Sequence, residues 1–174
     1  MPKPSTGPQV TTLTTPTIHH AADRVANLPA DAIFDLAHTR KIELELPYAG
    51  AVTPVEAWTL FTQGKAKLVD VRTPPEFKFV GSVPGSVNVE WRGYDPQPLA
   101  VFLETLRRVA SPSEPVLLLC RSAVRSDAAA DAAAEAGYAR VYNVLEGFEG
   151  QRNHSRRRGE IDGWRHRGLP WVQD

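Results

Sequence analysis

Apolar runs alternate with helix-like segments through the second half of the chain, and this alternation restricts the folds open to it. Val116 to Leu119 is a continuous aliphatic run, which is typical of a strand buried on both faces. The alanine-rich stretch from Ser126 to Ala136, closed by Gly137, predicts a helix. Arg140 to Val144 predicts the next strand. A strand, a helix and a strand in this order imply parallel strands joined by a crossover helix.

The segment before this unit continues the alternation with a helix, a strand and a further helix. Thr53 and Glu56 have the spacing of a capping box, and Pro54 suits the first turn of a helix. Leu68 to Val71 then predicts a buried strand, and Pro96 to Ala110 predicts an amphipathic helix. The predicted fold class is therefore α/β, with a mostly parallel sheet and helices on both faces.

We expect three parts along the chain. Residues 1–27 are rich in Pro and Thr and poor in large apolar residues, so they predict a flexible N-terminal arm. Residues 28–49 predict a docking helix and a connector, because apolar residues recur at helical spacing from Ala30. Residues 50–174 then form the main domain, which carries the arm as an N-terminal extension.

Charge and hydropathy give no argument for a nucleic-acid or membrane partner. The chain has 20 basic and 20 acidic residues, so its formal net charge is zero. It contains no apolar stretch of membrane-spanning length, and Met1 to His20 lacks the layout of a secretory signal. We therefore expect a cytoplasmic protein that binds neither nucleic acid nor membrane; these features leave a homodimer open.

The chain has a single cysteine, Cys120. One cysteine excludes an internal disulfide and a multi-cysteine zinc site, and the five histidines show no metal-ligand spacing. Neither a glycine-rich dinucleotide turn nor a Walker loop is present. We therefore expect no metal and no cofactor, and any group that Cys120 accepts must leave to another molecule.

Cys120 follows the strand 116–119 and precedes the predicted helix, at an edge where ligands of parallel sheets collect. If residues 121–126 curl so that their amides face inward, the sulfur lies among N–H donors near the positive end of the helix dipole. Arg121 and Arg125 add positive charge, which favours the thiolate. The alternative is that Cys120 is only a small buried apolar residue.

Four motifs together resemble the rhodanese-like sulfurtransferase family: the loop "CRSAVRS", the upstream "LVDVRTPPEF", the segment "GSVPGSVNV" and the closing "GFEG…GW…GLPW". The resemblance covers roughly residues 50–174. It implies a parallel-sheet rhodanese-like domain whose Cys120 carries a transferable sulfur as a persulfide. It further implies a small-molecule donor such as thiosulfate, and a thiol, cyanide or a protein as the acceptor.

The same resemblance implies the roles of the other site residues. The loop amides hold the outer sulfur, which makes these residues the substrate-binding set: Arg121, Ser122, Ala123, Val124, Arg125 and Ser126. Asp70, Arg72 and Glu76 match the acidic-and-arginine segment and are expected to support the loop. A surface or rim network of salt bridges is the alternative for these three residues.

Two other functions stay open. Cysteine-dependent phosphatases and arsenate reductases also use a cysteine between a strand and a helix, but the phosphatase pattern places five residues between Cys and Arg. Here four residues separate Cys120 from Arg125, and a shorter loop suits a sulfur atom better than a phosphoryl group. A non-catalytic module that docks a partner is the other alternative, with the N-terminal arm and "RNHSRRR" as its recognition surface.

Two features leave the shape and the charge of the pocket open. Many members of the family have glycine where this chain has Ala123, so the loop either avoids positive φ or is strained. Four arginines follow the last strand and predict a solvated loop, with an acidic partner or the steering of the anionic donor as alternatives. They are Arg152, Arg156, Arg157 and Arg158.

Overall fold

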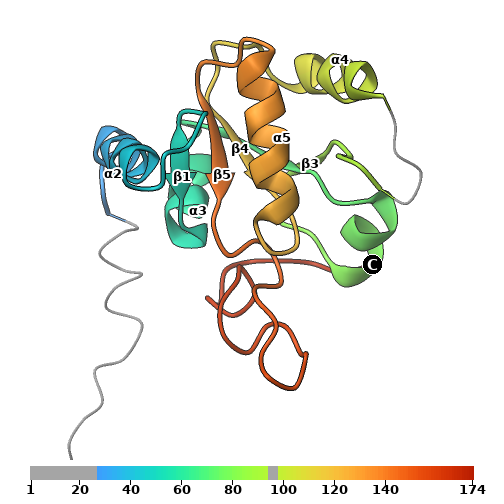
Figure 1. Cartoon of the computed structure of the whole chain (residues 1–174). Helices are drawn as coiled ribbons and strands as arrows, with labels where there is room; N and C mark the ends of the chain where they lie inside the picture. Colours follow the sequence, from blue (N-terminus) through green and yellow to red (C-terminus); the bar gives the residue numbers. More distant parts are fainter. Residues whose placement is uncertain (1–26, 94–97) are drawn as a thin grey trace, which may run out of the picture.

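Five parallel strands form the single sheet of the computed structural model, which describes residues 27–93 and 98–174 (Figure 1). The strands are β1 (Gly50–Val52), β2 (Lys67–Asp70), β3 (Val87–Asn88), β4 (Val116–Leu119) and β5 (Val141–Val144), in the spatial order β1-β5-β4-β2-β3. The helices are α2 (Ala30–Glu43), α3 (Pro54–Thr62), α4 (Leu99–Val109) and α5 (Val124–Glu135), with a π-helical turn η1 (Glu76–Val80). The predicted parallel α/β class is confirmed.

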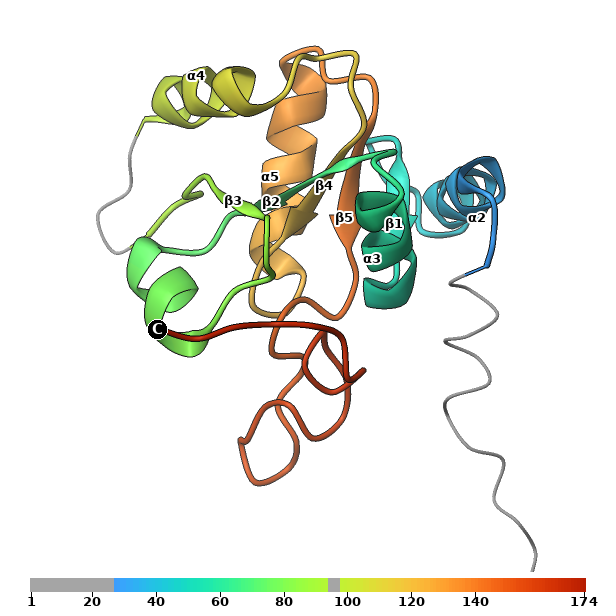
Figure 2. The ribbon, with the colours of Figure 1, turned by 180° about the vertical axis from the view of Figure 1, so that it is seen from behind.

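Helices cover both faces of the sheet. Helices α4 and α5 lie on one face, and Figure 2 shows α3 on the other face, with α2 beside the edge strand β1. Side chains of β4 alternate between the two layers: Val116 and Leu118 pack into the first, Leu117 and Leu119 into the second. The continuous apolar run in the sequence therefore reflects a strand buried on both sides.

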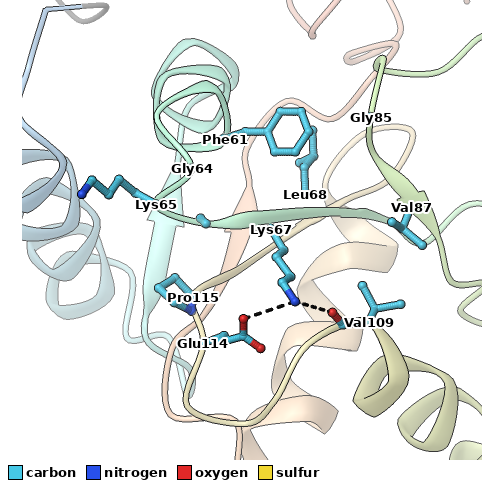
Figure 3. A pocket seen from close by; sticks show the side chains of 11 residues that line it. Phe61, Gly64, Lys65, Lys67, Leu68, Gly85, Val87, Val109, Glu114 and Pro115 are labelled. Atoms are coloured by element: carbon cyan, nitrogen blue, oxygen red, sulfur yellow. Dashed lines mark hydrogen bonds and ion pairs between the residues drawn. The ribbon is translucent and has the colours of Figure 1, made fainter.

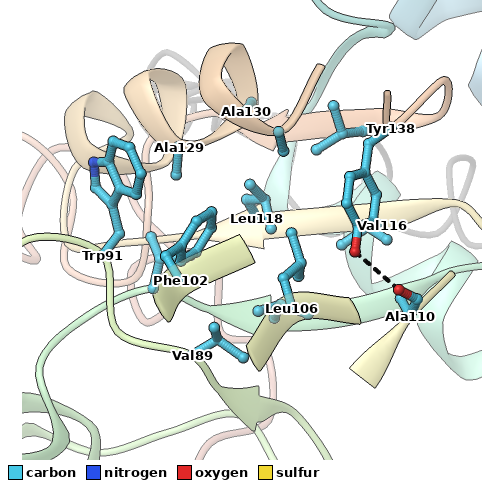
Figure 4. Close-up of a cluster of buried hydrophobic side chains, with 14 of the residues drawn as sticks. Val89, Trp91, Phe102, Leu106, Ala110, Val116, Leu118, Ala129, Ala130 and Tyr138 are labelled. Atoms are coloured by element: carbon cyan, nitrogen blue, oxygen red, sulfur yellow. Dashed lines mark hydrogen bonds between the residues drawn. The ribbon is translucent and has the colours of Figure 1, made fainter. Parts of the chain in front are cut away.

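The layer beneath α4 and α5 is shown in Figure 4. Trp91 meets Phe102 of α4 edge-on, with ring centroids 4.8 Å apart. Ala129 and Ala130 face the sheet from α5, where small side chains let the helix approach β4 closely. This packing fixes the direction of α5, and α5 begins at the loop that carries Cys120.

Helix α3 begins with the predicted capping box. The Thr53 hydroxyl accepts a hydrogen bond from the Glu56 amide at 3.3 Å, and the Glu56 carboxylate accepts one from the Thr53 amide at 2.8 Å. Glu56 also pairs with Arg40 of α2 at 2.7 Å, which ties the two helices together. The predicted arm, residues 1–27, lies outside the described residues except for its last residue.

Some elements differ from the sequence prediction. The strands β1 and β3 have three and two residues and were not predicted, because runs this short carry no periodicity. Helix α5 begins at Val124 rather than Ser126, since the chain enters the helix directly from the left-handed Ala123. The predicted helix 96–110 is observed from Leu99, and its first residues fall partly in the undescribed stretch 94–97.

After β5 the chain crosses the carboxyl edge of the sheet, where it forms the coil at the bottom of Figure 1. Trp164 is fully buried and donates its indole N–H to the Pro170 carbonyl. Val172 forms an antiparallel bridge with Ser82. These contacts anchor the tail beside the end of β4. Among the described residues, no helix has the length and apolar character needed to cross a bilayer.

Candidate functional site

Cys120 is the first residue after β4, and its side chain is buried within the layer beneath α5. Its carbonyl accepts a hydrogen bond from the Phe148 amide at 2.7 Å, and the preceding Leu119 carbonyl accepts one from the Val71 amide at 2.8 Å. Residues that follow β2 and β5 thus fix the backbone at the thiol. The residue that sequence reasoning selected lies at the carboxyl edge of the sheet, as predicted.

The loop from Cys120 to α5 turns through a left-handed residue. Ala123 has φ 69° and ψ −15°, a conformation that costs an alanine about 1 kcal/mol. Of the two possibilities raised above, the strained loop is the one observed. Hydrogen bonds to the Ala123 carbonyl hold it in place: the Asp127 amide donates at 2.9 Å and the Asn143 amide group at 3.3 Å.

The Ser126 hydroxyl links the thiol to this network. It lies 3.2 Å from the Cys120 sulfur and 2.7 Å from the Asn143 Oδ1, and Ser126 is fully buried. Because a hydroxyl has a single proton, it donates to one acceptor at a time. The Ala123 carbonyl, 3.1 Å away, is a third acceptor in reach, so the hydroxyl can direct its proton to a negatively charged sulfur or to either of the two oxygens. Sequence reasoning missed Asn143, which lies in the middle of β5 with no motif to mark it.

Glu76 and Arg125 form an ion pair beside the loop. The carboxylate of Glu76, on η1, accepts hydrogen bonds from both Arg125 guanidinium nitrogens at 2.8 and 2.6 Å. Burial pushes the pKa of Glu76 upward, but hydrogen bonds from Arg125 and Thr73 outweigh it and lower that pKa to about 2. The same hydrogen bond raises the pKa of Arg125. Glu76 therefore supports the loop through its charge.

Asp70 and Arg72 form a second pair that is completely buried. The closest nitrogen and oxygen are 2.6 Å apart, and both side chains are 0% exposed. Arg72 also donates to the Gly81 carbonyl and lies over the Phe148 ring, 4.2 Å from its centroid. The alternative of a surface network is therefore wrong for this pair, because both side chains are fully buried and Arg72 is held against Gly81 and Phe148.

A pocket of about 520 Å³ opens at the thiol. It is lined by Cys120, Arg121, Ser122, Val124, Arg125, Gln151, Arg152 and Arg158. Ala123 and Ser126 do not line this pocket; the Ser126 hydroxyl lies 3.1 Å from the Ala123 carbonyl, and the substrate-binding role expected of the two residues stays a prediction. A smaller pocket of about 300 Å³ shares Arg121 and Arg125 and reaches Glu76.

The segment after β5 supplies three lining residues that the motif analysis did not assign to the site. The solvated-loop interpretation holds for Arg156 and Arg157, which do not line the pocket; Arg152 is exposed as they are, but it belongs to the lining. Gln151, Arg152 and Arg158 lie against the cysteine loop, and the Gln151 side chain donates to the Ser122 carbonyl at 3.4 Å. The cluster of arginines in the sequence could have indicated that this segment reaches the site. Only the fold shows which of the arginines line the pocket.

A third pocket lies at the opposite, amino end of β2 and β4 (Figure 3). Its volume is about 460 Å³, and two of its three charged members, Lys67 and Glu114, bind each other at 3.2 Å. Lys67 also donates to the Val109 carbonyl at 2.6 Å. Because the only acidic group of this lining is already paired and the lining has no cysteine or histidine, the pocket at Cys120 is the better candidate for chemistry.

Comparison with known proteins identifies the family of this chain. The model of the rhodanese-like domain family matches residues 53–154, more than half of the chain. The chain therefore belongs to the rhodanese-like domain family. Within the described ranges, no cluster of three or more His, Cys, Asp or Glu side chains is arranged to hold a metal ion.

Individual relatives extend the comparison. A crystal structure of Rv0390 from M. tuberculosis is 44% identical, with a TM-score of 0.64, and the match covers 73% of this chain and 99% of that one. The uncharacterized protein RP600 of Rickettsia prowazekii is 31% identical over 64% of this chain and 87% of its own length. The thiosulfate sulfurtransferase GlpE of Actinobacillus succinogenes is 29% identical over 68% of this chain and 86% of its own length.

Proposed function

We propose that the protein is a sulfurtransferase that moves a sulfane sulfur from an anionic donor to a thiophilic acceptor through a persulfide on Cys120. The observation that carries the proposal is the placement of the only thiol of the chain in a pocket lined by four arginines. Membership of the rhodanese-like family and similarity to a thiosulfate sulfurtransferase support it. Thiosulfate is the donor that we propose to test first.

The reaction has two displacement steps. The Cys120 thiolate attacks the outer sulfur of thiosulfate, a new S–S bond forms, and the old S–S bond breaks as its electron pair leaves with sulfite. A second nucleophile, a thiolate or cyanide, then attacks the outer sulfur of the persulfide and restores the Cys120 thiolate. No second cysteine in the chain can resolve the intermediate, so the acceptor must be another molecule.

The surrounding residues have distinct tasks in this scheme. Arg121 and the other guanidiniums of the pocket attract the dianionic donor and the departing sulfite. The backbone amides of the loop and the Ser126 hydroxyl stabilise the negative sulfur, because Ser126 already lies 3.2 Å from Sγ. Asp70 and Arg72 hold the strand end, and Glu76 orients Arg125.

The short loop also separates this proposal from phosphatase and arsenate reductase activity. Four residues lie between Cys120 and Arg125, and Glu76 already engages the Arg125 guanidinium in two hydrogen bonds. A phosphoryl group needs donors for three non-bridging oxygens, which the shorter loop does not enclose. We therefore expect the wild-type protein to accept thiosulfate and to show negligible hydrolysis of aryl phosphates.

The test is intact-mass measurement of the purified full chain before thiosulfate, after thiosulfate and after subsequent cyanide. We expect Cys120 to gain one sulfur atom and then to lose it, with thiocyanate released. Cys120→Ser is the control, since a serine hydroxyl stays protonated at neutral pH and forms no persulfide. An unchanged mass of folded wild-type protein, or sulfur uptake by Cys120→Ser, would contradict the proposal.

A further inference from the structure

The segment 151–162 follows the "GFEG" motif and folds back over the mouth of the pocket. The Asp162 carboxylate accepts the Gln151 amide at 2.6 Å, and the Gly159 amide donates to the Glu149 carbonyl at 2.7 Å. The tip is closed by Asn153, whose side chain accepts the Arg157 amide at 2.8 Å. The segment is therefore an ordered loop, and it presents particular side chains to the pocket.

Two of its arginines face the site without an acidic partner. Arg158 is anchored by a hydrogen bond from its guanidinium to the Gly150 carbonyl at 2.6 Å. In the described part of the chain, neither Arg152 nor Arg158 forms an ion pair, whereas the nearby Glu149 pairs with Arg165. Burial and the positive charges of Arg121, Arg152 and Arg125 lower the pKa of Arg158, against the opposing effect of Glu149. The pocket thus holds positive charge that the protein itself does not neutralise.

The pocket is also larger than the proposed reaction with thiosulfate requires. Its volume of about 520 Å³ falls in the range typical of sites for small organic molecules. Cys120 lines the pocket from the loop before α5, and Arg152 and Arg158 line it from the segment after β5. A donor with its outer sulfur at Cys120 therefore has room for an organic leaving group that extends toward the two arginines.

We propose that Arg152 and Arg158 form a second anion subsite, which binds a carboxylate on the leaving half of a small organic persulfide. This inference rests on the proposed function. The Cys120 thiolate attacks the outer sulfur of R–S–SH, and the new S–S bond forms as the R–S–SH bond between the two sulfurs breaks. The electron pair leaves with the R–S thiolate, whose carboxylate stays paired with a guanidinium, and the hydrogen remains with the transferred sulfur.

The test compares two donors, glutathione persulfide, which carries two free carboxylates, and the persulfide of glutathione diethyl ester, in which both carboxylates are neutral ethyl esters. The second-order rate constant for sulfur uptake by Cys120 is measured by quenching and intact mass. We expect wild type to prefer the acid over the ester by roughly tenfold, which corresponds to one charge-assisted hydrogen bond. Arg152→Ala and Arg158→Ala should each bring this preference close to one.

Arg157→Ala is the matched control, because it removes the same charge from the same loop at a side chain that is 76% exposed and does not line the pocket. It should keep the wild-type preference. Arg152→Ala is the decisive variant, since Arg152 makes no hydrogen bond within the described residues whose loss could unfold the loop. Thermal melting of each variant verifies the fold.

Loading of Cys120 by thiosulfate distinguishes a failure of the subsite proposal from a failure of the proposed function. If thiosulfate loads Cys120 but wild type shows no preference for the acid, the subsite is wrong and the sulfurtransferase proposal stands. An equal loss of preference in Arg157→Ala would also overturn the subsite, because it would indicate general steering by net charge. If neither thiosulfate nor either persulfide loads Cys120, the proposed function itself fails.

Discussion

Two acid–arginine pairs flank the end of the cysteine strand, and they differ in burial rather than in chemistry. Asp70 and Arg72 are 0% exposed, whereas Glu76 and Arg125 are 21% and 25% exposed, although the closest approach is 2.6 Å in both pairs. The first pair is enclosed by strands and tail; the second faces the pocket. Chemically similar pairs thus have different roles. The fully buried pair stabilises the fold, whereas the partly exposed pair can contact a ligand in the pocket.

The largest effect should follow from breaking the buried pair. Arg72→Met keeps much of the side-chain volume but leaves the Asp70 carboxylate buried without its counter-ion. We expect a loss of about 3–5 kcal/mol in the free energy of unfolding. Denaturant unfolding followed by circular dichroism measures this loss.

Replacement of both partners separates the charge from the packing. The double variant Asp70→Asn/Arg72→Met has no unpaired charge and should recover part of the lost stability. If Arg72→Met lowers the free energy of unfolding by less than about 1 kcal/mol, the buried pair does not hold the fold together, and the contrast with the Glu76–Arg125 pair is wrong.

Breaking the Glu76–Arg125 pair, called the pocket pair below, should instead change activity. Arg125→Ala removes a positive charge from the pocket and leaves the Glu76 carboxylate beside an incoming anion. We expect sulfur uptake from thiosulfate to slow by a factor that corresponds to about 1–3 kcal/mol. The free energy of unfolding should change by less than about 1 kcal/mol, because the pair is partly solvated.

Removing the acid as well should rescue part of this loss. Glu76→Gln/Arg125→Ala no longer has the unpaired carboxylate and should react faster than Arg125→Ala alone. Arg108→Ala is the control, since it breaks an exposed pair with Glu104 on α4. Wild-type kinetics for Arg125→Ala would show that its guanidinium takes no part in binding the donor.

Part of the site was predictable because local sequence determines local structure. Val116 to Leu119 forms the predicted strand, and the capping box of Thr53 and Glu56 is present. Cys120 lies at the carboxyl edge because a buried strand followed by a helix permits no other place for it.

The rest depends on contacts between distant parts of the chain. Asn143 reaches Ser126 only because β5 lies beside β4. Arg152 and Arg158 line the pocket because their loop folds back onto the carboxyl edge, and nothing in a run of arginines distinguishes them from Arg157. Burial of Arg72 likewise arises from the tail, which no local pattern predicts.

The pocket pair should also leave a signature in the pH dependence of stability. The pKa of Glu76 falls from 4.5 to about 2 in the folded protein, so the folded state favours the ionised carboxylate. The stability that this group contributes is complete above pH 4.5 and is lost as the pH falls toward about 2. The difference in unfolding free energy between wild type and Glu76→Gln should therefore be largest above pH 4.5 and shrink on acidification.

The control for this experiment is Glu104→Gln, which removes the exposed acid of the pair on α4. Solvent screens that pair, so its variant should follow the wild-type pH profile closely. A difference between wild type and Glu76→Gln that stays constant from neutral pH to pH 2 would show that the stabilisation does not depend on the charge of Glu76.

The smallest effect concerns Ala123, whose φ of 69° strains the loop between the two pairs. Ala123→Gly removes the Cβ that disfavours this conformation, while the carbonyl keeps the hydrogen bonds from Asp127 and Asn143. We expect the free energy of unfolding to rise by about 0.5–1 kcal/mol in chemical denaturation. If the strain belongs to the backbone and not to the Glu76–Arg125 pair, the gain should be the same in wild type and in Glu76→Gln. A gain that vanishes in Glu76→Gln would mean that the ion pair forces Ala123 into its left-handed conformation, which would make the pocket pair part of the framework after all.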